Sequence, residues 1–521
     1  MAASALSSSR DSNNATYFGR SRVVLIGVIL ALFFGGLALR LTNFFDPPID
    51  VHGWRQLRSA AVARQIYMDS LPNVDPEVRA NAHYLGVVFS VLEPPLFENL
   101  VALTDRVVGQ EILWSARAYS ILFWLIGGLA LFGLAYRMTS VDGAIVALAY
   151  YLFLPFANTF SRTFLPEPMF IMWMLLAYYT IYRWMEAPGW KWAILTGLFA
   201  GIAILVKVFA VFGLIFGIGF FLASGVGIKK LVRQKQFWAA LALSVVIPVV
   251  YYLVLIPQYS VNYLDTWSKP FLYMLKDPTF YLRWLHWLQP LFSPVFLLAA
   301  VVGVVLHRPR ERWLALGMWA GYISLGLLLP SLITSHNYYS LQLVPVVALS
   351  LAPVGSTLLS KVARQGIFWQ LLVAGVILVG LGDAAIMARK EINIPGLAKE
   401  PAFWEQLAKD LPKNGDVIGL LEDYNTRMNY YGHTFVAYYP YSYDMTMAIQ
   451  GGKQFDLTAP NWDTFRAYTQ EYRYFLVTEM TEFERQPYLK DILYGYYPVV
   501  INGDRYVLFD LSKPARPLPA P

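Results

Sequence analysis

The segment D-V-H-G-W-R-Q-L-R at residues 50–58 places one carboxylate and two guanidinium groups close together in a very apolar chain. Arg55 and Arg58 are three residues apart, so they share one face of a helix. Their planar forks suit phosphate oxygens. Asp50 has the chemistry of a general base for an acceptor hydroxyl. The segment therefore predicts a site where an acceptor is deprotonated beside a phosphate group.

Further candidate residues stand where other apolar runs begin or end. Charges at membrane depth are costly, which makes such residues functional candidates. A single one of them is explained equally well as the polar end of a helix, but the whole set is not. Besides Asp50, Arg55 and Arg58, the set comprises His52, Trp54, Gln56, Glu93 (in L-E-P-P-L), Arg162 and Glu167 (in S-R-T-F-L-P-E-P-M), Lys207 (in L-V-K-V), and His336, Tyr338 and Tyr339 (in S-H-N-Y-Y-S).

Simpler interpretations of these residues stay open. Asp50 would also serve as the N-cap of the helix that follows it. The arginines would also reach lipid headgroups without a specific ligand, and Lys207 would also anchor a helix at the interface. A divalent-cation site is a further alternative, because carboxylate and imidazole groups suit several metal ions. Its ligands would be Asp50, His52, Glu93 and His336.

The composition is that of a membrane protein. Of 521 residues, 57% are hydrophobic and only 14% are charged, whereas soluble domains carry about 25% charged residues. The net charge of +7 does not indicate nucleic acid as a partner, because the basic residues cluster between apolar runs. The chain has no cysteine, which excludes disulfides, thiolate metal sites and a cysteine nucleophile.

Apolar runs long enough to approach a membrane span, which takes about 20 residues, recur along the chain. We expect eleven spans, at roughly 23–43, 113–136, 141–157, 165–182, 190–206, 208–224, 237–256, 289–306, 313–333, 338–356 and 367–387. Basic residues collect in alternate connecting loops, which places those loops and the N-terminus in the cytoplasm. With an odd number of spans, the C-terminal part lies outside. All the candidate site residues then fall on the outer side.

The predicted organisation has four parts. A cytoplasmic tail at 1–22 precedes a transmembrane catalytic domain at 23–388, whose first outer loop, 44–112, contains helices lying in the membrane interface. Another outer segment, 257–288, is rich in aromatic residues and suits a membrane-surface loop. An extracytoplasmic α/β domain follows at 389–512, with a short helix, a strand at D-V-I-G-L-L-E and an Asn-Gly hairpin near its end. A Pro-rich tail occupies 513–521.

Several motifs occur in a specific order across residues 20 to 360: D-x-H-x-W-R-Q, E-P-P-L, R-T-F-L-P-E-P-M, G-L-F-A-G-I-A-I-L-V-K and H-N-Y-Y-x-L-x-x-x-P. In this order the chain resembles GT-C glycosyltransferases of the protein O-mannosyltransferase and aminoarabinose-transferase type, in their bacterial family-39-like branch. Two departures are visible. Many relatives have two adjacent acids after the first span, and many have Lys-Pro-Pro where this chain has Glu93-Pro94-Pro95.

The resemblance implies transfer of a sugar from a polyprenyl-phosphate carrier to a lipid, glycan or protein acceptor at the outer face, with inversion. It places the general base on Asp50 and puts Glu93 and Glu167 in the cavity. Because the usual lysine is missing beside Glu93, phosphate binding falls to Arg55, Arg58 and Lys207.

The expected protein is therefore a multi-pass enzyme of the plasma (inner) membrane, surrounded by membrane lipids. Two alternatives remain, a transporter or flippase of lipid-linked sugars and a non-catalytic subunit of a surface-glycan complex. A transporter would carry its ionisable groups near the midplane in repeated halves. Here the charges lie near one face, and the sequence shows no internal repeat.

Overall fold

The computed structural model describes residues 16–88, 93–225, 227–255, 263–412, 416–450 and 462–518. The chain divides into two compact units. The helical unit comprises Met1–Phe44, Leu92–Phe97 and Ala116–Ile394, and the mixed unit comprises Phe45–Val91, Glu98–Ser115 and Pro395–Pro521. The mixed unit thus combines most of the first outer loop with the C-terminal region.

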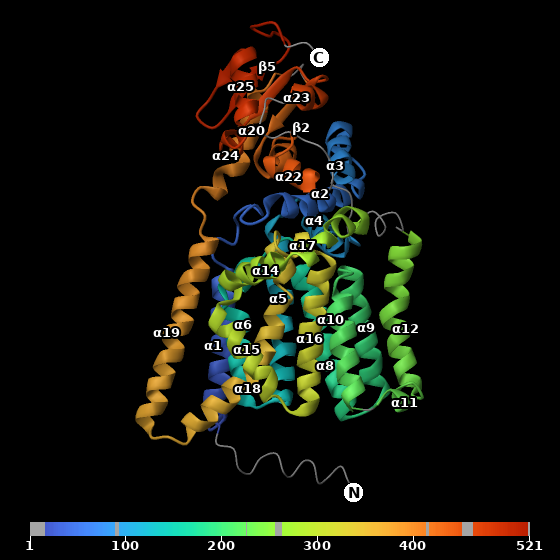
Figure 1. The fold of residues 1–521 in the computed structure, drawn as a ribbon, viewed down its shortest axis with the longest axis vertical. Helices are drawn as coiled ribbons and strands as arrows, with labels where there is room; N and C mark the ends of the chain where they lie inside the picture. Colours follow the sequence, from blue (N-terminus) through green and yellow to red (C-terminus); the bar gives the residue numbers. More distant parts are fainter. Residues whose placement is uncertain are drawn as a thin grey trace. The chain divides into compact units, whose positions relative to one another are not determined.

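Long apolar helices that run side by side build the helical unit (Figure 1). Each of the predicted apolar segments coincides with one of them, because an apolar run satisfies its backbone polar groups internally only as a helix. These helices are α1 (Arg22–Arg40), α5 (Trp114–Met138), α6 (Val141–Phe153), α8 (Glu167–Glu186), α9 (Trp190–Val206), α10 (Ala210–Gly225), α12 (Lys235–Val249), α15 (Pro294–Leu306), α16 (Pro309–Leu328), α18 (Leu343–Ala363) and α19 (Ile367–Ile392).

Only part of this set meets the length and hydropathy of a complete membrane span. Within the described residues five helical stretches do so, namely Arg22–Arg40, Trp114–Met138, Lys235–Leu255, Asn337–Ala363 and the one that starts at Ile367, and a bent helix pair would make a sixth. Several others, such as α6, α9 and α10, are apolar but shorter. The polytopic helical membrane fold is confirmed.

Glycines allow two of these helices to approach very closely. A Cβ atom on Gly317 of α16 would lie 2.3 Å from the carbonyl oxygen of Phe216 in α10. One on Gly321 would lie 2.6 Å from the Cα atom of Gly213. Small residues spaced by four are a common way for membrane helices to gain close packing where no hydrophobic effect acts between them. The α10–α16 contact is therefore one of direct backbone-to-backbone packing.

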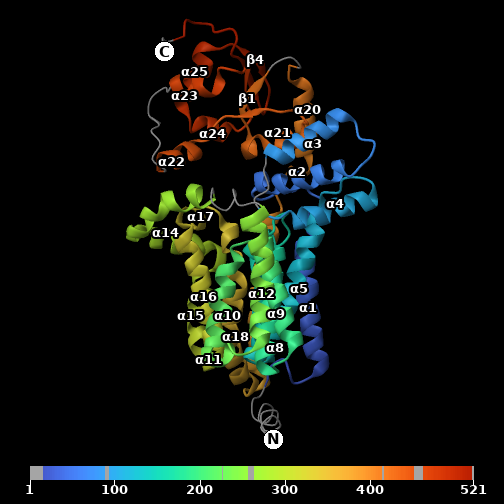
Figure 2. The same cartoon turned by 90° about the vertical axis from the view of Figure 1, so that its right-hand side faces the viewer.

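A sharp corner joins α14 (Pro278–Phe292) to α15. The two axes differ by 100°, and Figure 2 shows α14 lying across the direction of α15. Ser293 at the corner has a φ of 63° and is followed by Pro294. One face of α14 buries Phe280, Trp284 and Leu288 while Leu282 and Leu285 are exposed. The predicted surface loop at 257–288 therefore contains an amphipathic helix; residues 257–262 lie outside the described part.

The mixed unit contains a five-stranded sheet in the order β2-β1-β3-β5-β4. β1 (Val417–Leu420) pairs in parallel with β2 (Ala437–Tyr438) and β3 (Tyr474–Val477). β5 (Val507–Asp510) runs antiparallel to β3 and to β4 (Val499–Asn502). β1, β3 and β5 are fully buried, as expected of apolar runs covered on both faces. The predicted strand and the Asn-Gly hairpin are confirmed.

Helices surround this sheet and also form the outer loop. Around the sheet lie α20 (Glu400–Asp410), α21 (Thr426–Tyr431), α22 (Ser442–Gln450), α23 (Trp462–Thr469), α24 (Met480–Glu484) and α25 (Pro487–Tyr496). Residues 44–112, the predicted outer loop, form α2 (Gly53–Asp69), α3 (Pro76–Val88) and α4 (Leu96–Val108), and most of α4 belongs to the mixed unit. α2 packs against α3, α21 and the 3-10 turn η5 (Glu422–Asn425). Two of the outer-loop helices were predicted; α3 was not.

The carboxyl group of Asp105 on α4 is buried, and its Oδ1 accepts a hydrogen bond of 2.8 Å from the backbone N–H of Ile112. Burial raises the pKa of Asp105 to about 6. A carboxyl whose folded-state pKa is raised stabilises the fold below its unfolded pKa, and this contribution is lost as the pH rises through about 6. We therefore expect Asp105→Asn to raise the melting temperature at pH 7 more than at pH 4.

The measurement is thermal unfolding of detergent-purified protein at both pH values. Asp491→Asn, on an exposed carboxylate of α25, is the matched control and should change neither value. An equal shift of the Asp105→Asn variant at both pH values would contradict a buried, titrating carboxyl.

Candidate active site

Three ionisable candidates meet inside the helical unit. Glu167 is the first residue of α8, a helix started by the prolines around it. Lys207 follows the last turn of α9 in extended backbone. The Lys207 ammonium contacts Glu167 Oε1 directly and lies 3.5 Å from Glu93 Oε1. The side chains of Lys207 and Glu167 are only 4% and 2% exposed. Three of the predicted site residues, Glu93, Glu167 and Lys207, thus form one ion-pair cluster, in which Lys207 and Glu167 are buried.

Aromatic rings surround the ammonium of Lys207. Its Nζ lies 5.5 Å from the ring centroid of Tyr338 and 5.4 Å from that of Tyr339, within the range of a cation–π interaction. The Tyr339 hydroxyl is 2.8 Å from the hydroxyl of Tyr263, and Phe209 packs against both of these tyrosines. Tyr338 and Tyr339, predicted as substrate contacts, thus belong to the same cluster as Lys207.

Within the described part of the chain, the second carboxylate oxygen of Glu167 has no hydrogen-bond partner. This oxygen, Oε2, is buried. A buried polar atom without a partner is costly, and such an atom in a native structure calls for an explanation. A hydroxyl-bearing ligand would satisfy it, since a carboxylate oxygen accepts from O–H groups. The cluster therefore has the chemistry to hold a sugar hydroxyl.

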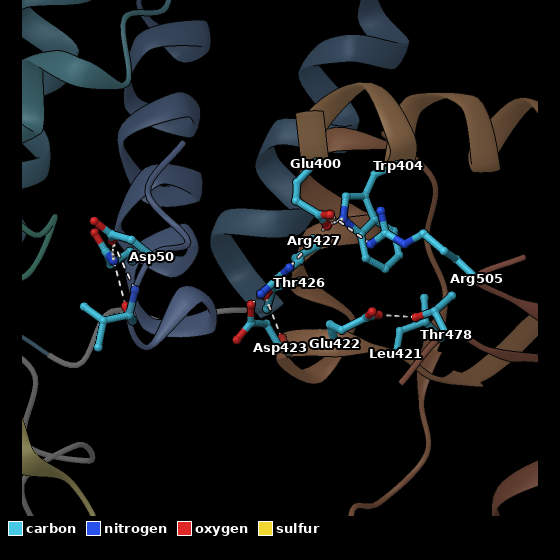
Figure 3. Close-up of polar contacts among 12 residues, drawn as sticks. Asp50, Glu400, Trp404, Leu421, Glu422, Asp423, Thr426, Arg427, Thr478 and Arg505 are labelled. Atoms are coloured by element: carbon cyan, nitrogen blue, oxygen red, sulfur yellow. Dashed lines mark hydrogen bonds and ion pairs between the residues drawn. The ribbon is translucent and has the colours of Figure 1, made fainter. Parts of the chain in front are cut away.

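Asp50 is fixed by the turn that follows it in the mixed unit (Figure 3). Its Oδ1 accepts hydrogen bonds from Gln56 Nε2 at 2.8 Å and from the backbone N–H of Val51 at 3.1 Å. Gln56 Nε2 also donates to the carbonyl of Val51 at 2.7 Å. The N-cap of α2 is His52, with a φ of 44°, so the interpretation of Asp50 as the N-cap was wrong. Asp50 is a half-buried carboxylate held by two donors.

The two arginines of the same segment differ in burial. Arg55 is 5% exposed, and its Nη1 donates to Ser59 Oγ at 3.4 Å. Arg58 is half-buried. Trp54 packs edge-on against Tyr424, with ring centroids 5.8 Å apart. The first turns of α2 thus carry two guanidinium groups and an aromatic ring, and the oriented carboxylate of Asp50 lies in the segment just before this helix.

Two further predicted residues lie in the helical unit, Arg162 and His336. Arg162 donates from Nη1 to the carbonyl of Thr42 and from Nη2 to that of Asn43 at 2.9 Å, so it fastens the end of α1. His336 Nδ1 lies 2.8 Å from Ser335 Oγ. No group of three or more histidine, cysteine, aspartate or glutamate side chains among the described residues is arranged to hold a metal ion.

A buried network in the mixed unit has no signal in the sequence. The Arg64 guanidinium lies 3.5 Å from the ring centroid of Tyr430, and its Nε is 3.0 Å from Glu111 Oε2. Arg64 Nη1 also donates to the carbonyl of Tyr430 at 2.8 Å. The network ties α2 to α21 and to the segment after α4. Arg64 and Tyr430 are 366 positions apart in the sequence, so periodicity and local spacing do not reveal the network.

Comparisons with known proteins give one family match and several structural matches. A protein-family model described as dolichyl-phosphate-mannose-protein mannosyltransferase matches residues 92–252. No curated protein matches the chain in sequence.

Solved structures share the fold over most of the chain. ArnT from Cupriavidus metallidurans, bound to undecaprenyl phosphate, superposes with a TM-score of 0.51 at 15% identity, over 94% of this chain and 97% of that one. An oligosaccharyltransferase from Archaeoglobus fulgidus, tethered with an acceptor peptide, gives 0.58 at 11% identity, over 92% and 73%. AglB from the same organism, with an inhibitory peptide and a dolichol-phosphate, gives 0.54 at 12%, over 92% and 74%. The resemblance to GT-C glycosyltransferases is confirmed.

Proposed function

From the GT-C fold of this chain we propose that it is a glycosyltransferase that moves a sugar from a polyprenyl-phosphate carrier to an acceptor at the outer membrane face. The observation that carries this proposal is the fixed position of Asp50, held by Gln56 and Val51 at the start of the helix that bears Arg55 and Arg58. A carboxylate oriented by two donors beside cations suits proton abstraction next to a phosphate leaving group.

The proposed reaction is a single displacement. Asp50 takes the proton of the acceptor hydroxyl, whose oxygen attacks the anomeric carbon of the donor sugar. The bond between that carbon and the phosphate oxygen breaks, and the polyprenyl phosphate leaves with the electron pair. Arg55 and Arg58 stabilise the charge that develops on the phosphate. Attack from the face opposite the leaving group inverts the anomeric configuration.

The helical unit supplies the proposed sugar contacts. Glu167 accepts a hydroxyl of the sugar at its unpartnered Oε2, and Lys207 fixes that carboxylate through its ion pair with Oε1. Glu93, at the longer distance of 3.5 Å from Lys207, is the partner that a donor phosphate oxygen would replace. The aromatic side chains of Tyr338 and Tyr339 line the same cluster.

The remaining assignments follow the same logic. His52, Trp54 and Gln56 contact substrate or orient Asp50, and Arg162 and His336 shape the cavity wall. Donors linked to polyprenyl phosphate are supported by the structural neighbours, which include ArnT bound to undecaprenyl phosphate and AglB with a dolichol-phosphate. The acceptor is a lipid, a glycan or a protein. We propose that the N-terminus is cytoplasmic and that Asp50 faces the outside of the plasma (inner) membrane.

Purified protein in detergent, supplied with radiolabelled polyprenyl-phosphate sugars, tests this function. We expect one donor to give transfer to added acceptor or slow hydrolysis, so the donor that reacts names the sugar. Heat-treated protein is the control. Saturable donor binding without turnover in any mixture would contradict the proposal. Movement of the donor across liposomes that contain the protein would then identify a flippase.

A further inference from the structure

The first turn of α2 has no capping side chain of its own. His52 at the N-cap has a left-handed φ of 44°, its side chain makes no capping hydrogen bond, and the first turn contains no acidic residue. A helix N-terminus carries partial positive charge and backbone N–H groups without intrahelical partners. Because Gln56 in this turn holds Asp50, whatever stabilises the turn also stabilises the position of the carboxylate.

A carboxylate from the C-terminal region lies against this turn. A Cβ atom placed on Gly53, the first residue of α2, would be 2.3 Å from Asp423 Oδ2 and 2.9 Å from Asp423 Cγ. Any side chain at position 53 would therefore displace Asp423. The neighbouring pair Trp54 and Tyr424 packs edge to face. A negative charge thus meets the positive end of α2 in close contact.

Asp423 stands at one end of a chain of ion pairs in which acidic and basic side chains alternate (Figure 3). Arg427 Nε is 2.5 Å from Asp423 Oδ2, and Arg427 Nη1 is 3.3 Å from Glu400 Oε2. Glu400 Oε1 is in turn 2.9 Å from Arg505 Nη2. Asp423, Arg427 and Glu400 are all less than one-fifth exposed. This chain of ion pairs connects the turn between β4 and β5 to the start of α2.

The backbone around Asp423 adopts a conformation that only a well-fixed loop maintains. Asp423, Tyr424 and Asn425 follow β1 with φ values of 52°, 56° and 65°. This left-handed region is tolerated by aspartate and asparagine but is costly for a residue such as tyrosine. The Asn425 side chain stabilises the loop, accepting from the N–H of Leu421 at 3.2 Å and donating to the carbonyl of Ala437 at 2.7 Å. Strain of this kind persists where the surrounding structure over-determines it, often at functional positions.

We propose that Asp423 is a positioning residue for the general base: the C-terminal α/β region caps α2 through Asp423 and thereby fixes Asp50. Only the expected change in kcat rests on the proposed function; the structural role of Asp423 does not. Asp423 touches neither donor nor acceptor. It acts through the contact with Gly53, and the contact between Gln56 and Asp50 carries the effect to the carboxylate.

The test compares Asp423→Ala, Asp423→Asn, Gly53→Ala and the double variant Gly53→Ala/Asp423→Ala in the full-length protein. We expect Asp423→Ala to lower kcat by about 10- to 100-fold, as for the loss of other orienting partners, with both KM values unchanged. Asp423→Asn keeps an accepting oxygen and retains more activity. Gly53→Ala pushes the Asp423 carboxylate away and lowers kcat similarly. The double variant has the same kcat as Asp423→Ala, because the two substitutions remove the same contact.

Hydrogen–deuterium exchange separates this inference from the proposed function. Faster exchange across residues 46–58 in Asp423→Ala, with the sheet unchanged, supports the cap even if no donor is ever turned over. Glu484→Ala is the control, because Glu484 pairs with Lys490 on the surface of the same region. Unchanged exchange in Asp423→Ala overturns the inference. A raised acceptor KM at unchanged kcat also overturns it, because Asp423 would then bind substrate directly.

Discussion

Asp50→Asn should lower kcat by about 10²- to 10⁴-fold, the usual contribution of a general base, while donor binding is retained. The amide oxygen of asparagine still accepts hydrogen bonds from Gln56 and Val51, so the local geometry survives. Only the ability to take a proton is lost. Transfer rates measured with the reactive donor give kcat, and a filter-binding assay measures donor binding.

Asp69→Asn is the matched control, because it makes the same change at an exposed position at the end of α2. It should transfer sugar at the wild-type rate. A fully active Asp50→Asn enzyme would remove Asp50 from the role of base and shift attention to the carboxylates of the helical unit.

Lys207→Met should destabilise the protein more than most single substitutions. It leaves Glu167 as a buried carboxylate without the ammonium of Lys207. Removing one partner of a buried ion pair costs about 3–5 kcal/mol. We expect a lower melting temperature in detergent and no transfer. The double variant Lys207→Met/Glu167→Gln should regain most of the stability, because the pair is then neutral, but it should not regain turnover.

Lys269→Met provides the comparison, since Lys269 pairs with Asp265 in an exposed position, where ion pairs contribute little. Its melting temperature should match the wild type. If Lys207→Met melts with the wild type, the cluster is not an ion pair in the folded protein, and the proposed orientation of Glu167 loses its basis.

The helices of the helical unit were predictable because apolar runs between basic loops leave the backbone no alternative within a membrane. The sequence placed Glu167 and Lys207 at the ends of predicted spans and Glu93 in the loop between the first two spans, so all three were expected on one side of the membrane. Direct contact between Lys207 and Glu167 did not follow, because spacing along the chain gives a side of the membrane and no distance.

The mixed unit was less predictable for a different reason. Short apolar runs such as V-I-G-L indicate strands, but the order of the sheet depends on pairings between distant segments. The cap from Asp423 to Gly53 and the packing of Arg64 on Tyr430 join positions more than 350 residues apart. The alternative of Asp50 as the N-cap arose because an aspartate before a helix is the usual signal; the left-handed His52 that takes this position has no such signal in the sequence.

The corner at Ser293 has a consequence for the lipid environment of this protein. The two axes meet at 100°, and Trp284 Nε1 of α14 donates to the Tyr322 hydroxyl of α16 at 3.3 Å, so α14 is anchored to the bundle at this angle. An amphipathic helix with aromatic side chains settles at the depth of the headgroups. Hydrophobic mismatch between bundle and bilayer is relieved by tilt or by local thinning at modest cost. With a rigid corner, a thinner bilayer must deform around α14 or tilt the whole bundle, so turnover should depend on acyl-chain length.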